Sequence, residues 1–257
     1  MTFRAWWRGG CLAAAMLVFA GAAGAGAVEV RGAGAAFAAP VLDAWIEAYT
    51  ARHDHLAIIF DAVGSGVGVR RFLAGEVPFG TSDAVLEDAE AAAVAAGLTV
   101  VPATAGAIAV AYNLPEVPSG LALSRDVLAG IFLGEITEWR DPRIVALNPE
   151  TDLPGLAITV VTRRDPAGST AAFTGHLSAI SPRWRERHGA ARLVAWPGVA
   201  IGATGEAGVA ELIAGSRGAI GYVADVTARR AALGVARLEN AAGALVARPV
   251  GPEGLAL

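Results

Sequence analysis

Lysine is absent from this chain of 257 residues, so all 20 of its basic side chains are arginine. A P-loop lysine, a Schiff-base lysine and a Ser–Lys dyad are therefore excluded. Cysteine is scarce as well: Cys11 is the single thiol, which excludes disulfides within the chain, thiolate metal clusters and redox pairs. Positive charge is in deficit, with a formal net charge of −4, and this argues against a nucleic-acid-binding surface.

Long apolar runs are also lacking, and the one near the N-terminus is shorter than the roughly 20 residues that a membrane span needs. Arg4 and Arg8 precede an apolar stretch over 11–20, and small residues follow up to Ala27. This order predicts a secretory signal peptide over 1–27, with a membrane anchor as the alternative. Cleavage after Ala27 leaves a periplasmic or secreted chain with no thiol and a net charge of about −6.

Short strand patterns alternate with helical ones through the rest of the chain, which predicts an α/β fold. The patterns predict helices over 40–49, 84–96, 124–132, 168–179 and 206–214, and strands over 28–30, 56–60, 98–102, 107–113, 157–162 and 219–223. About 230 mature residues can form one large domain or two small ones. We interpret Asn113-Leu114-Pro115 as the crossing from one lobe into a second.

Three polar turns stand directly before predicted helices, over 32–37, 64–68 and 163–169. Helix N-termini carry unpaired N–H groups and partial positive charge, so three that converge can bind an anion. The alternative is that each is an ordinary capped turn between a strand and a helix. The first turn lacks the third small residue of a dinucleotide-binding fingerprint, and no lysine follows the second as in a Walker A loop.

Seven short motifs, taken together in one order, are more specific than any single turn. In chain order they are Gly32-Ala-Gly-Ala-Ala-Phe-Ala-Ala-Pro40, Gly64-Ser-Gly-Val-Gly68, Phe79-Gly-Thr-Ser-Asp-Ala84, Ile131-Phe-Leu-Gly-Glu-Ile-Thr-Glu-Trp139 with Asp141, Leu147-Asn-Pro149, the run from Arg163 to Thr170, and Gly218-Ala-Ile-Gly-Tyr222. Their order and spacing over roughly residues 30–225 resemble the PstS-type phosphate-binding proteins of ABC importers. The resemblance implies a two-lobe, type II-like periplasmic-binding-protein fold with the ligand in a cleft between the lobes. Lobe 1 would comprise 28–113 and about 225–257, and lobe 2 would comprise 114–224.

The resemblance also implies which residues contact the anion. They are Ala36, Phe37, Ser65, Gly66, Asp83, Arg163, Asp165, Gly168 and Ser169. Most of them supply backbone or hydroxyl donors, while Arg163 pairs with the anion through its planar fork of donors and Asp165 steadies it. No cofactor or metal is expected. The implied partners are inorganic phosphate and the membrane permease subunits of the importer, and the protein itself is expected to be a monomer.

Asp83 is the unusual member of this set, because a carboxylate beside an anion repels it unless the ligand donates a proton. Phosphate near neutral pH carries a P–OH group and sulfate carries none, so an acceptor-only carboxylate selects phosphate. Arsenate, whose shape and protonation are similar, meets the same requirement. The alternative is that Asp83 only caps the helix predicted over 84–96.

The chain also departs from the family pattern. Ala36 and Ala167 stand where PstS-type proteins usually carry hydroxyl residues, and the binding serine of the second turn corresponds either to Ser65 or to Gly66. Only about 35 residues follow Tyr222, so lobe 1 is expected to be minimal or incomplete. These departures motivate a second hypothesis, an oxyanion sensor or scaffold that has lost tight phosphate binding.

A secreted serine hydrolase is the third hypothesis. Ser169 and His176 could belong to a catalytic triad, but Ser169 is not in a Gly-x-Ser-x-Gly elbow. His53, His55 and His188 lie among charged residues, which favours a solvated surface over metal ligation. We therefore expect a binding protein and not an enzyme.

Overall fold

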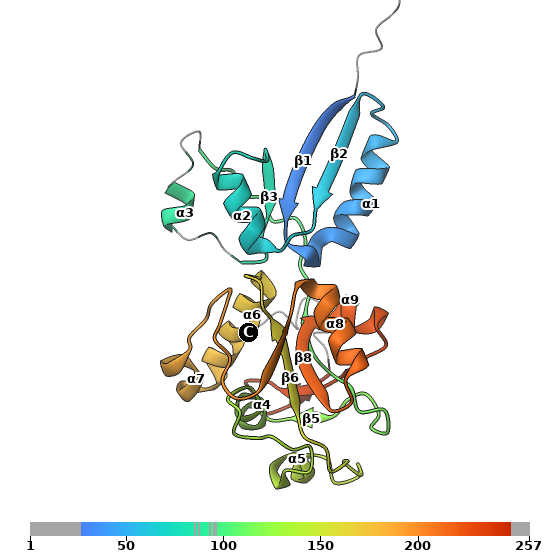
Figure 1. The fold of residues 1–257 in the computed structure, drawn as a ribbon, viewed down its shortest axis with the longest axis vertical. Helices are drawn as coiled ribbons and strands as arrows, with labels where there is room; N and C mark the ends of the chain where they lie inside the picture. The colour runs from blue at the N-terminus through green and yellow to red at the C-terminus, as the bar shows by residue number, and fades with distance from the viewer. Residues whose placement is uncertain (1–26, 85, 87, 93, 95–96, 248–257) are drawn as a thin grey trace, which may run out of the picture.

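The computed structural model describes residues 27–84, 86, 88–92, 94 and 97–247, so the predicted signal peptide lies outside the described residues except for Ala27. Figure 1 shows two units, one above the other, each built on its own sheet. Within the described ranges, no helix is both long enough and apolar enough to cross a membrane.

The N-terminal unit is a three-stranded parallel sheet in the order β2-β1-β3, with helices beside it (Figure 1). Its elements are β1 (Val28–Gly34), η1 (Ala36–Ala38), α1 (Ala39–Thr50), β2 (Leu56–Asp61), α2 (Ser65–Leu73), β3 (Phe79–Thr81) and α3 (Asp88–Ala92). Pro40 lies in the first turn of α1, where its missing N–H is not needed. Helix α1 packs on β2, and α2 packs on β1 and β3.

The C-terminal unit is a mixed five-stranded sheet in the order β7-β6-β8-β4-β9, with a small sheet β11-β10-β5 at its edge. Its elements are β4 (Ile108–Tyr112), β5 (Ala122–Leu123), α4 (Arg125–Phe132), α5 (Pro142–Leu147), β6 (Thr159–Arg163), α6 (Gly168–Ile180), α7 (Pro182–Arg187), β7 (Ala200–Ala203), α8 (Gly205–Gly215), β8 (Ala219–Ala224), α9 (Asp225–Arg230), β9 (Gly234–Val235), β10 (Arg237–Glu239) and β11 (Leu245–Val246). Residues of α4 and α6 pack with one face of the sheet, and residues of α8 and α9 pack with the other.

Most of the buried apolar surface lies in the C-terminal unit. Trp139 and Trp184 are fully buried, and their ring N–H groups donate to the carbonyls of Gly218 and Gly189. Burial of a large apolar side chain stabilises the fold by about 1.5–3 kcal/mol. The motif that ends at Trp139 therefore belongs to this core. By contrast, α1 contributes no buried residue.

The strand pairing corrects the predicted crossing at residue 113. Strand β4 pairs antiparallel with both β8 and β9, so residues 108–112 belong to the sheet of the C-terminal unit. The return segment also differs from the prediction, because β9 pairs with β4 and β10 pairs with β5. The physical reason is that β4 is buried along most of its length and has a hydrogen-bonding neighbour on each side.

The fold class and most of the predicted elements are confirmed. Helices α1, α6 and α8 and strands β2, β6 and β8 end within two residues of the predicted limits. The strand predicted over 98–102 is absent from the described stretch 97–107. Val100 and Val101 are 71% and 72% exposed, so they neither pair with another strand nor pack in a core. Of the helix predicted over 84–96, the described residues contain α3.

Candidate functional site

The first two polar turns touch each other where β1 and β2 end. Gly64 donates its N–H to the carbonyl of Gly34 at 2.8 Å. A Cβ on Gly68 would lie 2.3 Å from the Cα of Gly34, so only glycine permits this approach. Ala35 donates its N–H to the carbonyl and the hydroxyl oxygen of Thr81, at 3.1 and 2.9 Å. These bonds join the ends of the three parallel strands into one edge.

The third polar turn, between β6 and α6, packs against this edge from the C-terminal unit. A Cβ on Gly66 would lie 2.6 Å from the Cβ of Pro166 and 3.0 Å from its carbonyl oxygen. A Cβ on Gly64 would lie 3.3 Å from Nη2 of Arg163. The N-terminus of α2 and the turn before α6 are therefore in close contact, and the three predicted turns meet at the junction of the two units.

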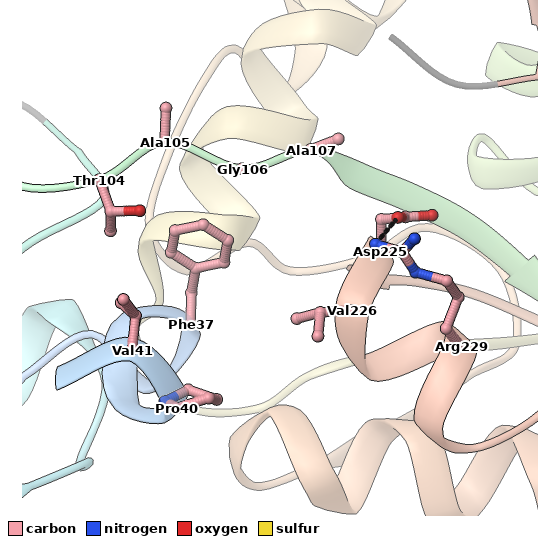
Figure 2. A pocket seen from close by; sticks show the side chains of 10 residues that line it. All are labelled: Phe37, Pro40, Val41, Thr104, Ala105, Gly106, Ala107, Asp225, Val226 and Arg229. Atoms are coloured by element: carbon pink, nitrogen blue, oxygen red, sulfur yellow. Dashed lines mark ion pairs between the residues drawn. The ribbon is translucent and has the colours of Figure 1, made fainter. Parts of the chain in front are cut away.

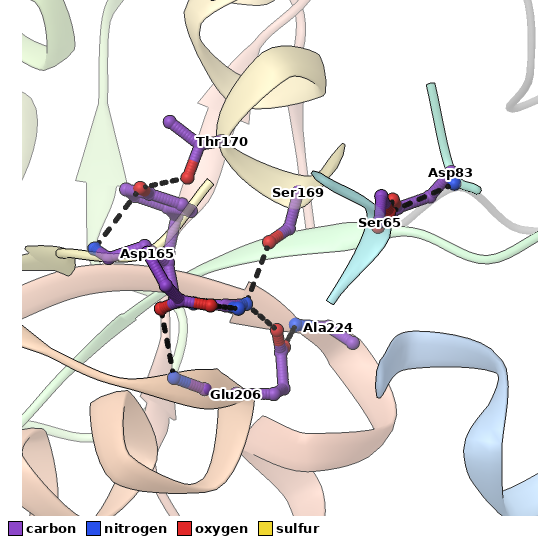
Figure 3. Close-up of polar contacts among 10 residues, drawn as sticks. Ser65, Asp83, Asp165, Ser169, Thr170, Glu206 and Ala224 are labelled. Atoms are coloured by element: carbon purple, nitrogen blue, oxygen red, sulfur yellow. Dashed lines mark hydrogen bonds and ion pairs between the residues drawn. The ribbon is translucent and has the colours of Figure 1, made fainter. Parts of the chain in front are cut away.

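Asp83 lies across this junction. Its carboxylate accepts a hydrogen bond from the hydroxyl of Ser65, and its N–H lies 3.3 Å from the same oxygen (Figure 3). A Cβ on Gly168, the first residue of α6, would lie 1.5 Å from Oδ1 of Asp83, so the carboxylate rests directly on that helix end. A second link between the units is the ion pair of Glu90 in α3 with Arg192, at 2.7 Å.

Arg163 is the buried cation of the site, with only 4% of its surface exposed. Its Nε donates to Oδ1 of Asp165 at 2.9 Å, and its Nη2 donates to Oδ2 of the same carboxylate. The remaining nitrogen, Nη1, lies 3.4 Å from Oγ of Ser169 and 3.5 Å from Oε2 of Glu206 (Figure 3). One side of the guanidinium fork is thus fixed by Asp165, and the other faces the start of α6.

A second layer of hydrogen bonds holds this arginine and its carboxylate in place. The phenol oxygen of Tyr222 accepts the N–H of Arg163 at 3.3 Å and bonds with Oγ1 of Thr170 at 2.7 Å. Burial raises the pKa of Tyr222 to about 12, so the phenol stays protonated at neutral pH. The N–H of Gly205, at the start of α8, donates to Oδ1 of Asp165 at 3.0 Å.

The charges of the cluster influence one another. Burial lowers the pKa of Arg163, but bonding to Asp165 and the nearby charge of Glu206 outweigh burial, so the pKa lies above its ordinary value. Burial raises the pKa of Asp165, and the hydrogen bond from Arg163 reverses this, so that pKa lies below its ordinary value. Burial raises the pKa of Glu206 despite its bond to the N–H of Ala224.

Glu206 is the member of the cluster that the sequence did not reveal. It lies in the first turn of α8, where acidic residues are common because they favour the positive end of the helix dipole. Nothing in its sequence neighbourhood distinguishes it from such an ordinary residue. The structure brings it to Arg163 because α8 begins directly after β7, which is the neighbour of β6 in the sheet.

Ala36 and Phe37 lie in η1, and the side chain of Phe37 faces a different part of the molecule. Its ring packs on Gly106, where an added Cβ would lie 2.2 Å from the ring. The ring is part of the lining of a pocket between α1, the connection 104–107 and α9 (Figure 2), whose volume is about 260 Å³. An anion contact through the N–H groups of Ala36 and Phe37 stays a prediction.

The neighbours of Ser169 do not support a catalytic triad. Its hydroxyl bonds with Arg163, and the described residues show no bond between it and His176. His53 stacks on Tyr49 and His188 packs on Trp184, each as part of the surface structure. Across the described ranges, no group of three or more His, Cys, Asp or Glu residues is arranged to hold a metal ion.

Comparison with known proteins places the chain in a family. A family model described as the PBP superfamily domain matches residues 20–248. The chain is 36% identical over 217 residues to the phosphate-binding protein PstS of Xylella fastidiosa, which covers 84% of this chain and 58% of that protein. It is 38% identical over 221 residues to the PstS protein of Pasteurella multocida, which covers 86% of this chain and 63% of that protein. The chain thus spans about three fifths of the length of these curated relatives.

A solved structure supports the fold. A phosphate-bound putative phosphate ABC transporter substrate-binding protein from Clostridium perfringens superposes with a TM-score of 0.63 at 21% identity. The superposition covers 86% of this chain and 79% of that chain. At this level of identity the likeness concerns the fold, and the identity of a ligand has to be argued from the residues of the site.

Proposed function

Since the chain belongs to the PBP superfamily, we propose that it captures inorganic phosphate outside the cytoplasm for an ABC importer. The observation that carries the proposal is the pairing of two opposite groups at the junction of the units. Arg163 directs Nη1 toward the start of α6, and Asp83 rests on the same helix end from the other unit. The PstS names of the relatives give independent support for phosphate.

The described groups match the chemistry of a partly protonated oxyanion. Nη1 of Arg163 and the hydroxyl of Ser169 are donors, and the N-termini of α2 and α6 add partial positive charge. Oδ1 of Asp83 carries the bond from Ser65, which leaves Oδ2 as an acceptor for a P–OH group. Sulfate has no proton to donate, so the carboxylate of Asp83 repels it and no hydrogen bond offsets this repulsion.

In this proposal the N-terminal and C-terminal units are the two lobes, and they close on the anion. The sequence pattern of residues 1–27 supports export, and the site residues support binding without catalysis. Delivery to the permease subunits of an importer follows from the family. The second candidate function, an oxyanion sensor, is favoured by the alanines at positions 36 and 167, which remove two hydroxyl groups from the turns.

Calorimetric titration of the mature chain with phosphate, and in parallel with sulfate, tests the proposal. We expect one phosphate per chain and sulfate binding that is weaker by about fivefold to 100-fold, because leaving the charge of Asp83 without a donor when sulfate binds costs about 1–3 kcal/mol. No binding at millimolar phosphate, or equal affinity for sulfate, would contradict phosphate capture. Binding of both anions with similar, weak affinity would favour the sensor.

A further inference from the structure

Glu206 contacts the nitrogen of the Arg163 guanidinium that Asp165 does not bind. Its side chain is buried, with Oε1 accepting the N–H of Ala224 and Oε2 lying 3.5 Å from Nη1 of Arg163. Of the other two nitrogens, Nε donates its single N–H to Asp165, and Nη2 donates one of its two N–H groups to the same carboxylate. Nη1 is therefore shared between Glu206 and Ser169, at the place where an anion has to bind.

The charge balance makes this arrangement unusual for an anion site. The cluster contains one cation, Arg163, and three carboxylates, those of Asp83, Asp165 and Glu206. Asp165 neutralises the arginine, so an anion that arrives next to Nη1 meets the negative charge of Glu206 in a buried setting. Like charges in such a setting interact strongly, and the least costly response of a carboxylate is to take up a proton.

We propose that Glu206 takes up one proton when phosphate binds, and thereby couples the affinity of the site to pH. This inference rests on the proposed function. The proton comes from solvent and converts the carboxylate to the acid, whose O–H can then donate to the anion while Oε1 keeps the bond from Ala224.

The groups around Glu206 give the direction of the pH dependence. Arg163 from β6 favours the carboxylate form, whereas Asp83 and Asp165 favour the acid, and Tyr222 from β8 stays neutral below its pKa of about 12. Burial raises the pKa of Glu206 before any anion is present. A bound anion raises it further, so binding takes up protons, and affinity rises as the pH falls through the titration of Glu206.

Titration calorimetry with inorganic phosphate in buffers of different ionisation enthalpy measures the protons taken up. We compare the wild type with Glu206→Gln, and use Glu211→Gln as the control because Glu211 is an exposed residue of the same helix. Free phosphate titrates in the same way in all three experiments, so its contribution from solution cancels in the comparison. We expect the wild type and the control to take up as much as one proton more per phosphate than Glu206→Gln. For the wild type and the control, the slope of log Kd against pH should be steeper than for Glu206→Gln by the same number of protons.

At the upper end of the pH range, Glu206→Gln should bind phosphate on the order of tenfold more tightly than the wild type, and the difference should narrow as the pH falls. Equal proton uptake by the wild type and Glu206→Gln overturns the inference and leaves phosphate capture intact. Weaker binding by Glu206→Gln at every pH also overturns it, since Glu206 would then only position Arg163. If the wild type does not bind phosphate, the proposed function and this inference fall together.

A second measurement follows the titration in the wild-type protein and uses a variant only to assign the resonance. Carboxyl ¹³C NMR of glutamate-labelled wild-type protein follows each Glu side chain through its titration. We expect one buried carboxyl resonance to titrate at a higher pH with phosphate than without it, and Glu206→Asp identifies it by removing that resonance from the glutamate set. Identical titration curves for every glutamate, with and without phosphate, contradict the inference.

Discussion

Asp83 and Ser65 form a pair whose hydrogen bond sets the orientation of the carboxylate. Asp83→Asn replaces an acceptor-only group by one that also donates, so sulfate gains a hydrogen-bond partner and loses a repelling charge. We expect the preference for phosphate over sulfate to fall by on the order of tenfold, measured as the ratio of the two dissociation constants. Asp88→Asn, at an exposed residue of α3, is the matched control. An unchanged ratio would mean that Asp83 has only a structural role.

At the scale of single residues, the sequence identifies candidate site residues where the chemistry of anion binding restricts the residue type. Arg163, Asp165, Ser169 and Asp83 were singled out, and the structure brings them to one place, although their roles toward an anion remain predictions. Glu206 could not have been found, because its contact with Arg163 depends on how β7 and α8 lie beside β6. A residue whose partner lies 43 positions away leaves no local pattern.

The start of α6 gives a prediction at the scale of a single element. Ala167 is the N-cap residue of this helix, with the extended backbone that a cap requires but without a side-chain oxygen. In Ala167→Ser the hydroxyl can accept a helix N–H and still donate its own proton to an anion. We expect stabilisation by about 1 kcal/mol and a melting temperature higher by roughly 2–4 °C without ligand. Phosphate binding should also tighten by several-fold.

The control for this prediction is Ala171→Ser, the same substitution inside the helix. Serine in a helix interior is slightly unfavourable, so this variant should melt no higher than the wild type. A higher melting temperature for Ala167→Ser with an unchanged phosphate affinity would mean that the hydroxyl only caps the helix. A lower melting temperature would mean that the buried position does not satisfy the hydroxyl.

Elements with a strong local signal were predicted closely, and those that depend on partners were not. Pro40 marks the start of α1, and the hydroxyl of Ser124 caps α4 by accepting the N–H of Val127 at 3.3 Å. The apolar run near Val100 has the composition of a strand but no neighbour to pair with, so it remains an exposed connection. Strand pairing is a tertiary property, and apolar composition alone does not supply it.

At the scale of the whole molecule, the sequence predicted the α/β class, but it left open whether the three turns converge or are ordinary capped turns, and it placed the crossing between the units too late. The signal at Asn113-Leu114-Pro115 marks the end of β4, and β4 already belongs to the C-terminal sheet. A turn signal shows where a strand ends and not which sheet that strand joins. The contact between the two units is therefore best tested at a residue that touches both.

Gly66 is such a residue, because it lies in the first turn of α2 and faces Pro166 across the junction. A Cβ at this position would lie 2.6 Å from the Cβ of Pro166 and 3.0 Å from its carbonyl oxygen, and neither atom is the end of a flexible side chain. Since alanine is favourable in a helix, Gly66→Ala should leave the fold stable while holding the two units apart. We expect phosphate affinity to fall by at least about tenfold, the equivalent of 1.4 kcal/mol.

Small-angle scattering shows whether Gly66→Ala weakens phosphate binding by holding the two units apart or by a local loss of contacts. The radius of gyration of the wild type should decrease when phosphate is added, and that of Gly66→Ala should stay at the larger value. Gly215→Ala is the control, because a Cβ at the end of α8 meets no atom within 4 Å, and it should close as the wild type does. If Gly66→Ala also contracts and keeps its affinity, then the close approach of α2 to Pro166 is not part of the phosphate-bound state. Closure would then have to take place around a different contact, such as the ion pair between Glu90 and Arg192.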